Sequence, residues 1–318
     1  MSVQRLFQYL HINYSESFQT LPTCTLIRLK HSAAQVNEHR AKVMGRGLPE
    51  RKPLPGVKSI ILVASGKGGV GKTTTAVNLA CAMKVIEPDK EIGLLDADVF
   101  GPSVPLMMNI SGEPMLNDDN LIEPLLNYGV KCMSMGLLVS GENAVVWRGL
   151  MVMQALERLT RHVAWGPLDC LVVDTPPGTG DTHLSLAQNL PIDGALVVTT
   201  PQSAALQVTK RGVNMLEKLK VPIIGMVENM SYAICHSCGT KNYVFGNETK
   251  KTADEMGLEI IQTFEVDQNM SECINSGKPA IYALPDSALA EKYRVLANKV
   301  FKYIEIKDNR NELAKAKD

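Results

Sequence analysis

The sequence lacks three features, and each absence narrows the class of protein. No run of about 18 apolar residues occurs, so we expect no membrane-spanning helix. Neither sign of charge is in excess, because 33 Lys and Arg balance 33 Asp and Glu, and no global field favours nucleic acid or an anionic membrane. The seven cysteines are scattered apart from one close pair, which excludes a secreted disulfide framework and fits a reducing compartment.

The 318 residues are enough for one large α/β domain or two small ones. Residues 1–34 hold three basic residues against one acid, Glu16, a composition typical of a mitochondrial transit peptide; a disordered cytosolic extension is the alternative. Residues 35–57 are polar and rich in proline, which predicts a stiff linker. A nucleotide-binding domain is expected over 58–305, followed by a polar tail at 306–318 that we expect to fray.

A glycine-rich stretch is the strongest motif of the sequence. Residues 66–73 have the Gly-x4-Gly-Lys-Thr pattern of a phosphate-binding loop, between an apolar run at 60–64 and an apolar-periodic segment. Glycines let the backbone turn its N–H groups to phosphate oxygens, and the following helix adds its dipole. The pattern predicts Lys72 along the β- and γ-phosphates, Thr73 on Mg²⁺ and Thr74 near the α-phosphate. The predicted nucleotide-binding residues are Gly66, Lys67, Gly68, Gly69, Val70, Gly71, Lys72, Thr73 and Thr74.

Two further buried strands are predicted to end in carboxylates. Residues 91–95 lead into Asp96 and Asp98, and an Asp-x-Asp pair beside a phosphate site suits Mg²⁺-bound water and general base work. A plain turn or N-cap role is the alternative for Asp98. The apolar run 171–173 precedes Asp174, as in a Walker B strand whose aspartate holds Mg²⁺ through water. We therefore expect Asp96 and Asp174 near the metal and Asp98 near the attacking water.

Buried strands alternate with helical segments along the chain. This order predicts a doubly wound α/β fold, with a mostly parallel sheet and helices on both faces. The strand 222–227 ends just before Asn229, at the carboxyl edge where open sheets bind ligands. Its amide matches the edge of adenine, although a loop-capping role fits the spacing equally well. The last helix is expected from 287 to 303.

A Cys-x-x-Cys pair interrupts the domain at 230–246. Cys235 and Cys238 are followed by a glycine turn rather than a helix, which argues against a thioredoxin-like site. Two thiolates are half of the four that a [4Fe–4S] cluster or a tetrahedral zinc ion needs, and a symmetric dimer supplies the other two. The spacing does not select the metal. His236 is interpreted as a bystander.

Lys67, inside the loop, resembles the additional lysine of the SIMIBI ATPases, the group that contains nitrogenase iron protein, MinD and ParA. The resemblance implies that Lys67 reaches the γ-phosphate of a partner subunit, and therefore an ATP-sandwich homodimer with Lys67, Lys72 and Asp98 as catalytic residues. A solvated loop lysine is the alternative.

From residue 42 to 303 the sequence resembles the Mrp/NUBPL branch of the MinD-type ATPases, which carry iron–sulfur clusters to apoproteins. The motifs that carry this resemblance are the phosphate loop, Asp96-Ala97-Asp98, Gly101-Pro102-Ser103, Trp147-Arg148-Gly149, Asp174 to Asp181, Asn229-Met230-Ser231 and the cysteine pair. The residues Arg46 to Pro49 and Trp147 to Met153 resemble the mitochondrial member of the branch, an assembly factor for respiratory complex I.

The resemblance implies a homodimeric, weakly active ATPase of the mitochondrial matrix. It would use ATP and Mg²⁺, bind a labile [4Fe–4S] cluster between subunits, and deliver it to apo iron–sulfur subunits of complex I. Peripheral binding to the inner membrane, without a spanning helix, is compatible with this interpretation. The alternatives are a ParA/MinD-like positioning ATPase, for which no basic face or terminal amphipathic helix is evident, and a zinc-stabilised ATP-binding scaffold.

Three positions depart from the pattern of the family. His236 stands where the family has proline between the cysteines, and Ser271 stands where it has arginine. Phe264-Glu265-Val266-Asp267 replaces Ile-Pro-Leu-Asp. Ser271 and the segment 264–267 lie in the region expected near the adenine.

Overall fold

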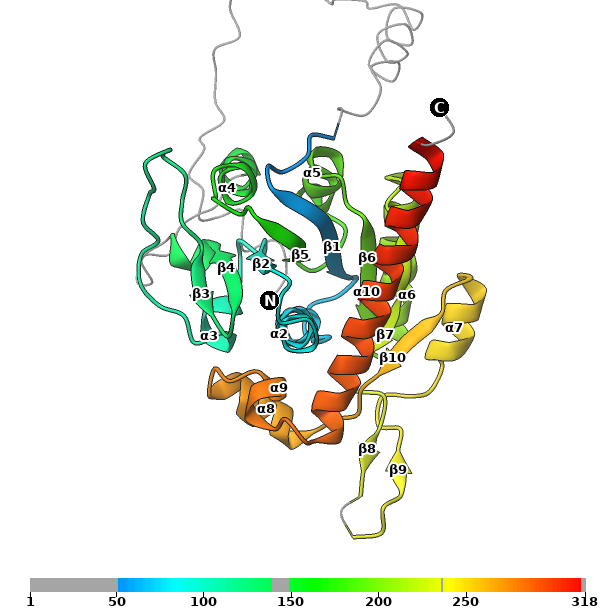
Figure 1. The fold of residues 1–318 in the computed structure, drawn as a ribbon. Helices are drawn as coiled ribbons and strands as arrows, with labels where there is room; N and C mark the ends of the chain where they lie inside the picture. Colours follow the sequence, from blue (N-terminus) through cyan, green and yellow to red (C-terminus); the bar gives the residue numbers. More distant parts are fainter. Residues whose placement is uncertain (1–50, 139–148, 236, 316–318) are drawn as a thin grey trace, which may run out of the picture. The chain divides into compact units, whose positions relative to one another are not determined.

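A computed structural model describes residues 51–138, 149–235 and 237–315, and its centre is an eight-stranded sheet (Figure 1). The strand order is β10-β7-β6-β1-β5-β2-β4-β3, and every pair is parallel except β3 with β4. The strands are β1 (Val57–Ser65), β2 (Ile92–Asp96), β3 (Leu125–Asn127), β4 (Val130–Ser134), β5 (Leu168–Asp174), β6 (Gly194–Thr199), β7 (Ile223–Glu228) and β10 (Ile260–Thr263). The predicted transit peptide and most of the predicted linker lie outside the described residues.

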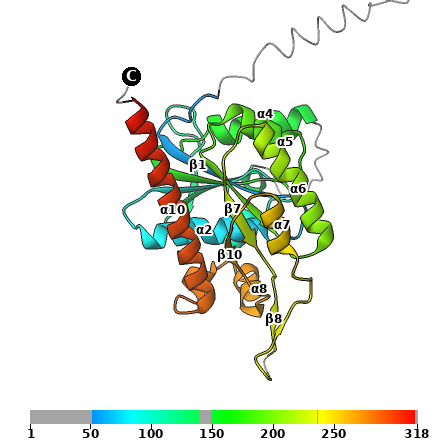
Figure 2. The ribbon, with the colours of Figure 1, turned by 90° about the vertical axis from the view of Figure 1, so that its right-hand side faces the viewer.

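Helices cover both faces of this sheet, as Figure 2 shows. The helices on one face are α2 (Lys72–Ile86), α8 (Gln268–Asn275), α9 (Ala280–Ala283) and α10 (Ala288–Lys315). On the other face lie α4 (Gly149–Arg161), α5 (Asp181–Asn189) and α6 (Ser203–Lys218). The remaining elements are α3 (Val104–Met107), the 3-10 turn η2 (Met135–Leu137), α7 (Thr249–Glu255) and the hairpin strands β8 (Ala233–Ile234) and β9 (Lys241–Asn242). The predicted doubly wound fold is confirmed.

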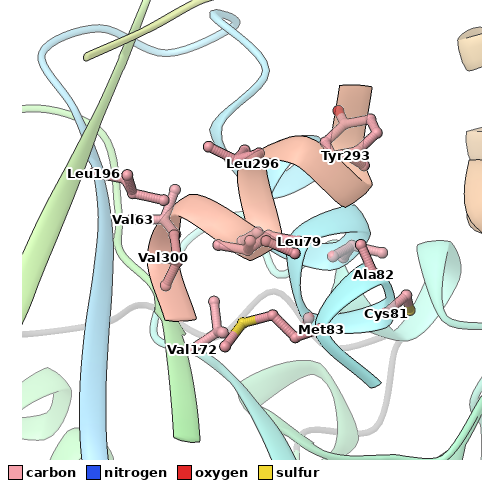
Figure 3. Packing of buried hydrophobic residues seen from close by; sticks show 14 of the residues in the cluster. Val63, Leu79, Cys81, Ala82, Met83, Val172, Leu196, Tyr293, Leu296 and Val300 are labelled. Carbon is pink, nitrogen blue, oxygen red and sulfur yellow. The ribbon is translucent and has the colours of Figure 1, made fainter. Parts of the chain in front are cut away.

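The central strands are apolar along their whole length because both of their faces are covered. In the hydrophobic cluster below the phosphate loop, α2 and α10 lie against β1, β5 and β6 (Figure 3). The side chains that meet there include Val63, Leu79, Met83, Val172, Leu196, Leu296 and Val300. This packing holds the end of β1 and the start of α2 in place, and these two ends carry the phosphate loop.

The last helix is longer than predicted, because α10 continues to Lys315 instead of ending at 303. Residues 304–315 contain no glycine or proline that would break a helix, and they are rich in good helix formers. The helix is also tied to the sheet, since the Tyr303 hydroxyl donates to the Asp193 carbonyl and Lys307 pairs with the Asp193 carboxylate. Within the described ranges, no helix combines the length and apolarity needed to cross a bilayer.

Two leucines of α10 provide a matched test of this packing. Leu296 is fully buried between α2 and the sheet, whereas Leu313 is 64% exposed on the same helix. We expect Leu296→Ala to lower the free energy of unfolding by about 2–5 kcal/mol, because it removes buried apolar surface and leaves a cavity. Leu313→Ala should change it by no more than about 0.5 kcal/mol. Urea titration followed by circular dichroism measures both, and equal losses would contradict this account of the core.

Candidate functional site

The phosphate loop is the turn Gly66–Gly71 between β1 and α2. Gly69 and Gly71 have φ of +78° and +88°, in the left-handed region that favours glycine. A Cβ at Gly71 would lie 2.1 Å from Asn229 Nδ2, while a Cβ at Gly69 would meet nothing within 4 Å. A cavity of about 200 Å³ lies over the loop, and Lys72, Thr73 and Thr74 contribute to its lining. The predicted strand–loop–helix arrangement is therefore present.

A buried ion pair lies at the base of the loop. The Lys72 ammonium donates to Asp174 Oδ1 at 2.6 Å, and the Thr73 hydroxyl donates to Asp174 Oδ2 at 2.6 Å. Asp174 is fully buried and Lys72 is 6% exposed. Burial raises the pKa of Asp174, and its bonds to Lys72 and Thr73 oppose that rise. The Asp174 carboxylate therefore connects the end of β5 to the first turn of α2.

Asp96 lies beside this pair, directly opposite Asp174 in the register of β2 and β5. Its carboxylate accepts hydrogen bonds from the backbone N–H groups of Asp98, Ser103 and Val104 and from the Ser134 hydroxyl. Burial, and then the charge of Asp174, raises the pKa of Asp96 to about 7. The carboxylate therefore organises the loop that follows β2, and its predicted place near Mg²⁺ stays a prediction.

Asp98 has the turn-forming role that was the alternative to a role near the attacking water. Its Oδ1 accepts from the backbone N–H groups of Phe100 and Gly101, each at 3.2 Å. The residue is half-buried and contributes to the lining of the cavity over the phosphate loop. This position is compatible with the predicted contact with attacking water, which stays a prediction.

Lys67 lies on the exposed rim of the loop and contributes to the lining of the cavity over it. Its side chain is exposed, and its ammonium lies 3.5 Å from the Gln202 side-chain oxygen at the start of α6. Lys72, not Lys67, makes the buried contact with Asp174. An exposed lysine at the rim is available to a second copy of the chain and is equally compatible with the alternative, a solvated lysine.

Asn229 follows β7, and its side chain contacts the phosphate loop directly. Its side-chain amide donates to the Val70 carbonyl at 2.9 Å, and its backbone N–H donates to the Thr199 carbonyl at 2.8 Å. The loop-capping role is therefore present. The second amide N–H and the side-chain oxygen remain for the predicted contact with adenine.

The cysteine pair lies on an exposed hairpin that extends away from the sheet in both views (Figures 1 and 2). Cys235 follows β8, and its N–H donates to the Thr240 carbonyl just before β9. Cys238 Sγ lies 3.2 Å from the Thr240 hydroxyl oxygen, and hydrogen bonds from Thr240 and then Cys235 lower the pKa of the exposed Cys238 thiol. Among the described residues, no group of three or more His, Cys, Asp or Glu could hold a metal ion.

His183 is a residue that the sequence analysis did not identify. It lies in the first turn of α5, is 1% exposed, and neither ring nitrogen has a hydrogen-bond partner among the described residues. Burial, followed by the charge of Lys72, lowers the pKa of its imidazole to about 4. The only signal in the sequence is a histidine near the start of a short, mostly polar helical segment that begins three residues after Pro176-Pro177-Gly178.

The parallel sheet, the loop between β1 and α2 and the aspartate at the end of β5 define a MinD-like P-loop NTPase. Solved structures with the same fold support this assignment. A nucleotide-binding protein from Archaeoglobus fulgidus, in complex with ADP, is 34% identical with a TM-score of 0.62, covering 71% of this chain and 89% of its own. MinD from Pyrococcus horikoshii with Mg-ADP has a TM-score of 0.59 at 22% identity, covering 79% of this chain and 98% of its own, and shows the fold alone.

The sequence comparisons identify the particular family. The ParA family profile described as NUBPL iron-transfer P-loop NTPase matches residues 56–301. The Mus musculus iron-sulfur cluster transfer protein NUBPL is 48% identical over 266 residues, which cover 83% of each chain. The Arabidopsis thaliana iron-sulfur protein required for NADH dehydrogenase, mitochondrial, is 46% identical over 288 residues, 90% of this chain and 92% of its own. This chain belongs to the NUBPL family, and the resemblance seen in its sequence is confirmed.

The buried ion pair gives a first prediction for this site. Asp174→Ala leaves the Lys72 ammonium buried without its partner, so we expect the free energy of unfolding to fall by about 3–5 kcal/mol. The matched control is Lys58→Ala, which breaks the exposed Lys58–Asp169 pair and should cause no measurable change. Denaturant titration of the nucleotide-free protein compares the two. A similar small effect of both substitutions would show that Asp174 does not stabilise the loop.

The two left-handed glycines give a second prediction. Gly69→Ala and Gly71→Ala introduce the same kind of backbone strain, but only the second also clashes with Asn229. We expect Gly71→Ala to destabilise the protein by about 1–3 kcal/mol more than Gly69→Ala, because overpacking is added to the strain. The double variant Gly71→Ala/Asn229→Ala should recover most of that difference in thermal unfolding. Failure of the second substitution to restore any stability would exclude the contact as the cause.

Proposed function

We propose that this protein is a mitochondrial iron–sulfur cluster carrier, in which two copies hold a [4Fe–4S] cluster between them and pass it to apo subunits of complex I. The observation that carries the proposal is the cysteine pair at the tip of an exposed hairpin. Membership of the NUBPL family supports it. So do the names of two relatives, the iron–sulfur cluster transfer protein from mouse and the protein required for mitochondrial NADH dehydrogenase from Arabidopsis.

The number of sulfur ligands requires two copies. A [4Fe–4S] cluster takes four thiolates, and each chain offers Cys235 and Cys238 on the hairpin. The described residues contain no further group that could complete the set within one chain. A two-fold axis through the cluster would supply two thiolates from each copy. An exposed site also suits a cargo that has to leave, since a client can approach the cluster without the carrier unfolding.

The phosphate loop fits ATP and Mg²⁺. Its donor set is an ammonium, a hydroxyl and the loop N–H groups, and Asp174 and Asp96 supply carboxylates beside them. When bound, Mg²⁺·ATP supplies the phosphoanhydride bond that is hydrolysed. Lys72 and the loop N–H groups would hold the phosphate oxygens, and the Thr73 hydroxyl would hold Mg²⁺, with Asp96 and Asp174 in its outer shell. Asn229 holds the loop and contacts adenine, and Asp98 orients the attacking water.

Lys67 acts between the copies in this proposal. Its exposed position leaves it free of the bonds made by Lys72, and a facing subunit would place it near the phosphates of its neighbour. Nucleotide binding would then bring the copies together, and their hairpins would meet. ATP occupancy and cluster binding are coupled in this way, and hydrolysis separates the copies when the cluster is delivered.

The cellular assignments belong to the same proposal. Residues 1–34 act as a mitochondrial transit peptide, residues 35–57 act as a linker, and the ATPase domain 58–305 works in the matrix. Apo iron–sulfur subunits of complex I are the clients there, and contact with the inner membrane is peripheral. A reporter fused to residues 1–40 tests the targeting separately from the chemistry.

Anaerobic reconstitution of the full chain with iron and sulfide tests the cluster. We expect about four irons per dimer and the broad absorbance of a [4Fe–4S] cluster. Cys235→Ala should abolish both, whereas Cys273→Ala, which removes a buried thiol in α8, should retain them. Stoichiometric zinc in place of iron, or a protein that stays a single copy with ATP and reconstituted iron, would overturn the proposal.

A mixing experiment tests whether Lys67 acts between copies. Lys67→Ala alone and Lys72→Ala alone should each lose ATP turnover. In a mixed dimer, however, ATP bound by the Lys67→Ala copy meets the intact Lys67 of the other copy. An equal mixture should recover about a quarter of the wild-type rate, because half of the dimers are mixed and each has one complete site. No recovery above the separate variants would contradict action between copies.

A further inference from the structure

A second, larger cavity of about 720 Å³ lies beside the cavity over the phosphate loop. Three segments line it: the loop after β2, helix α4, and the segment from Pro176 to His183 that leads into α5. Asp98 and Pro177 line both cavities, so they form the wall between the two. A movement of Asp98 or Pro177 therefore changes the shape of both cavities.

His183 lines the larger cavity without using its hydrogen-bonding groups. Both ring nitrogens are shut off from solvent and have no partner among the described residues. Burial and the nearby Lys72 charge keep the imidazole neutral at physiological pH, with a pKa lowered to about 4, so the ring has one N–H donor and one acceptor. Buried polar atoms without partners are rare and costly, which makes this arrangement of the ring unfavourable.

The segment before His183 is linked to the phosphate loop. The Gly178 N–H donates to the Ser65 carbonyl at 3.0 Å, and Ser65 is the last residue of β1 before the loop begins. Gly178 has φ of +95°, and a Cβ at Gly178 or Gly180 would meet nothing within 4 Å. Glycines with room around them can act as hinges, so the segment 176–180 has the means to follow a change in the loop.

We propose that His183 is a positioning residue whose ring donates a hydrogen bond to the Asp98 carboxylate when the segment 176–180 closes on bound nucleotide. Asp98 is suited to accept it, because this carboxylate lines the same cavity and has lone pairs beyond those of Oδ1, which the turn uses. The bond holds Asp98 at the wall of the phosphate cavity, where it orients water. The larger cavity provides the space through which the two residues approach.

This inference rests on the proposed function, since it requires bound ATP. Wild-type nucleotide binding is therefore measured first by calorimetry with Mg²⁺ and a non-hydrolysable ATP analogue. Absence of binding would overturn the proposed function and this inference together. Binding without any response of His183 would overturn this inference alone.

The direct test observes the imidazole in the full chain labelled with ¹⁵N-histidine. We expect the His183 ring signals to shift on saturation with Mg²⁺ and the analogue, and the N–H proton to become protected from exchange. The His183→Gln variant assigns the signals, and exposed His162, removed in His162→Gln, is the internal control that should not respond. Unchanged His183 signals in the nucleotide-bound protein would overturn the proposal.

Steady-state ATP turnover supplies a second readout. His183→Leu should lower kcat roughly tenfold with KM for ATP within about twofold, the loss of one hydrogen bond to a charged group. His183→Gln, which keeps a side-chain donor, should retain most of the rate, and His162→Gln all of it. His183→Leu added to Asp98→Asn should cause no further loss, because the two residues act as a unit. Multiplicative losses, or equal rates in His183→Leu and wild type, would overturn the proposal.

Discussion

The buried contact of Asp174 with Lys72 and Thr73 is the interaction on which the rest of the structure depends. A carboxylate that is buried away from solvent at the end of a central strand is tolerated only when it is paired with a cation and hydrogen-bonded. Both partners come from the first turn of α2, so the same contact fixes the start of that helix and closes the phosphate loop. The lysine and the threonine of the phosphate-loop motif are thus held together at the end of β5.

In our proposal, both functional sites need a second copy of the chain. The hairpin offers two thiols, and Lys67 stands at the rim of the loop instead of among the buried groups. Lys67 and Cys238 are exposed and Cys235 is partly buried, so these side chains contribute little to the core of one copy. Their shared requirement for a second copy is the physical basis for coupling nucleotide binding to cluster binding in our proposal.

Local patterns predicted the fold and the principal motifs well. Apolar runs followed by glycine or aspartate gave the strands, the phosphate loop and the Walker B carboxylate, because each depends on residues close together in the chain. The end of α10 was predicted wrongly, because the charged tail at 306–318 was expected to fray, whereas Tyr303 and Lys307 contact Asp193, which lies 110 and 114 residues away in the chain. The predicted role of Asn229 was left between two alternatives because the Val70 carbonyl it caps is 159 residues away.

The sequence by itself determined that the chain is a P-loop protein with a parallel sheet and a Cys-x-x-Cys pair in a loop, since spacing and hydrophobic order are local properties. Only the tertiary structure determined which side chains contact one another across the chain. Lys72 and Asp174 are 102 residues apart, and strand order brings β1 and β5 side by side so that they pair. The burial of His183 has the same cause, because the exposure of a side chain depends on the helices and loops packed around it, and no short stretch of sequence contains that information.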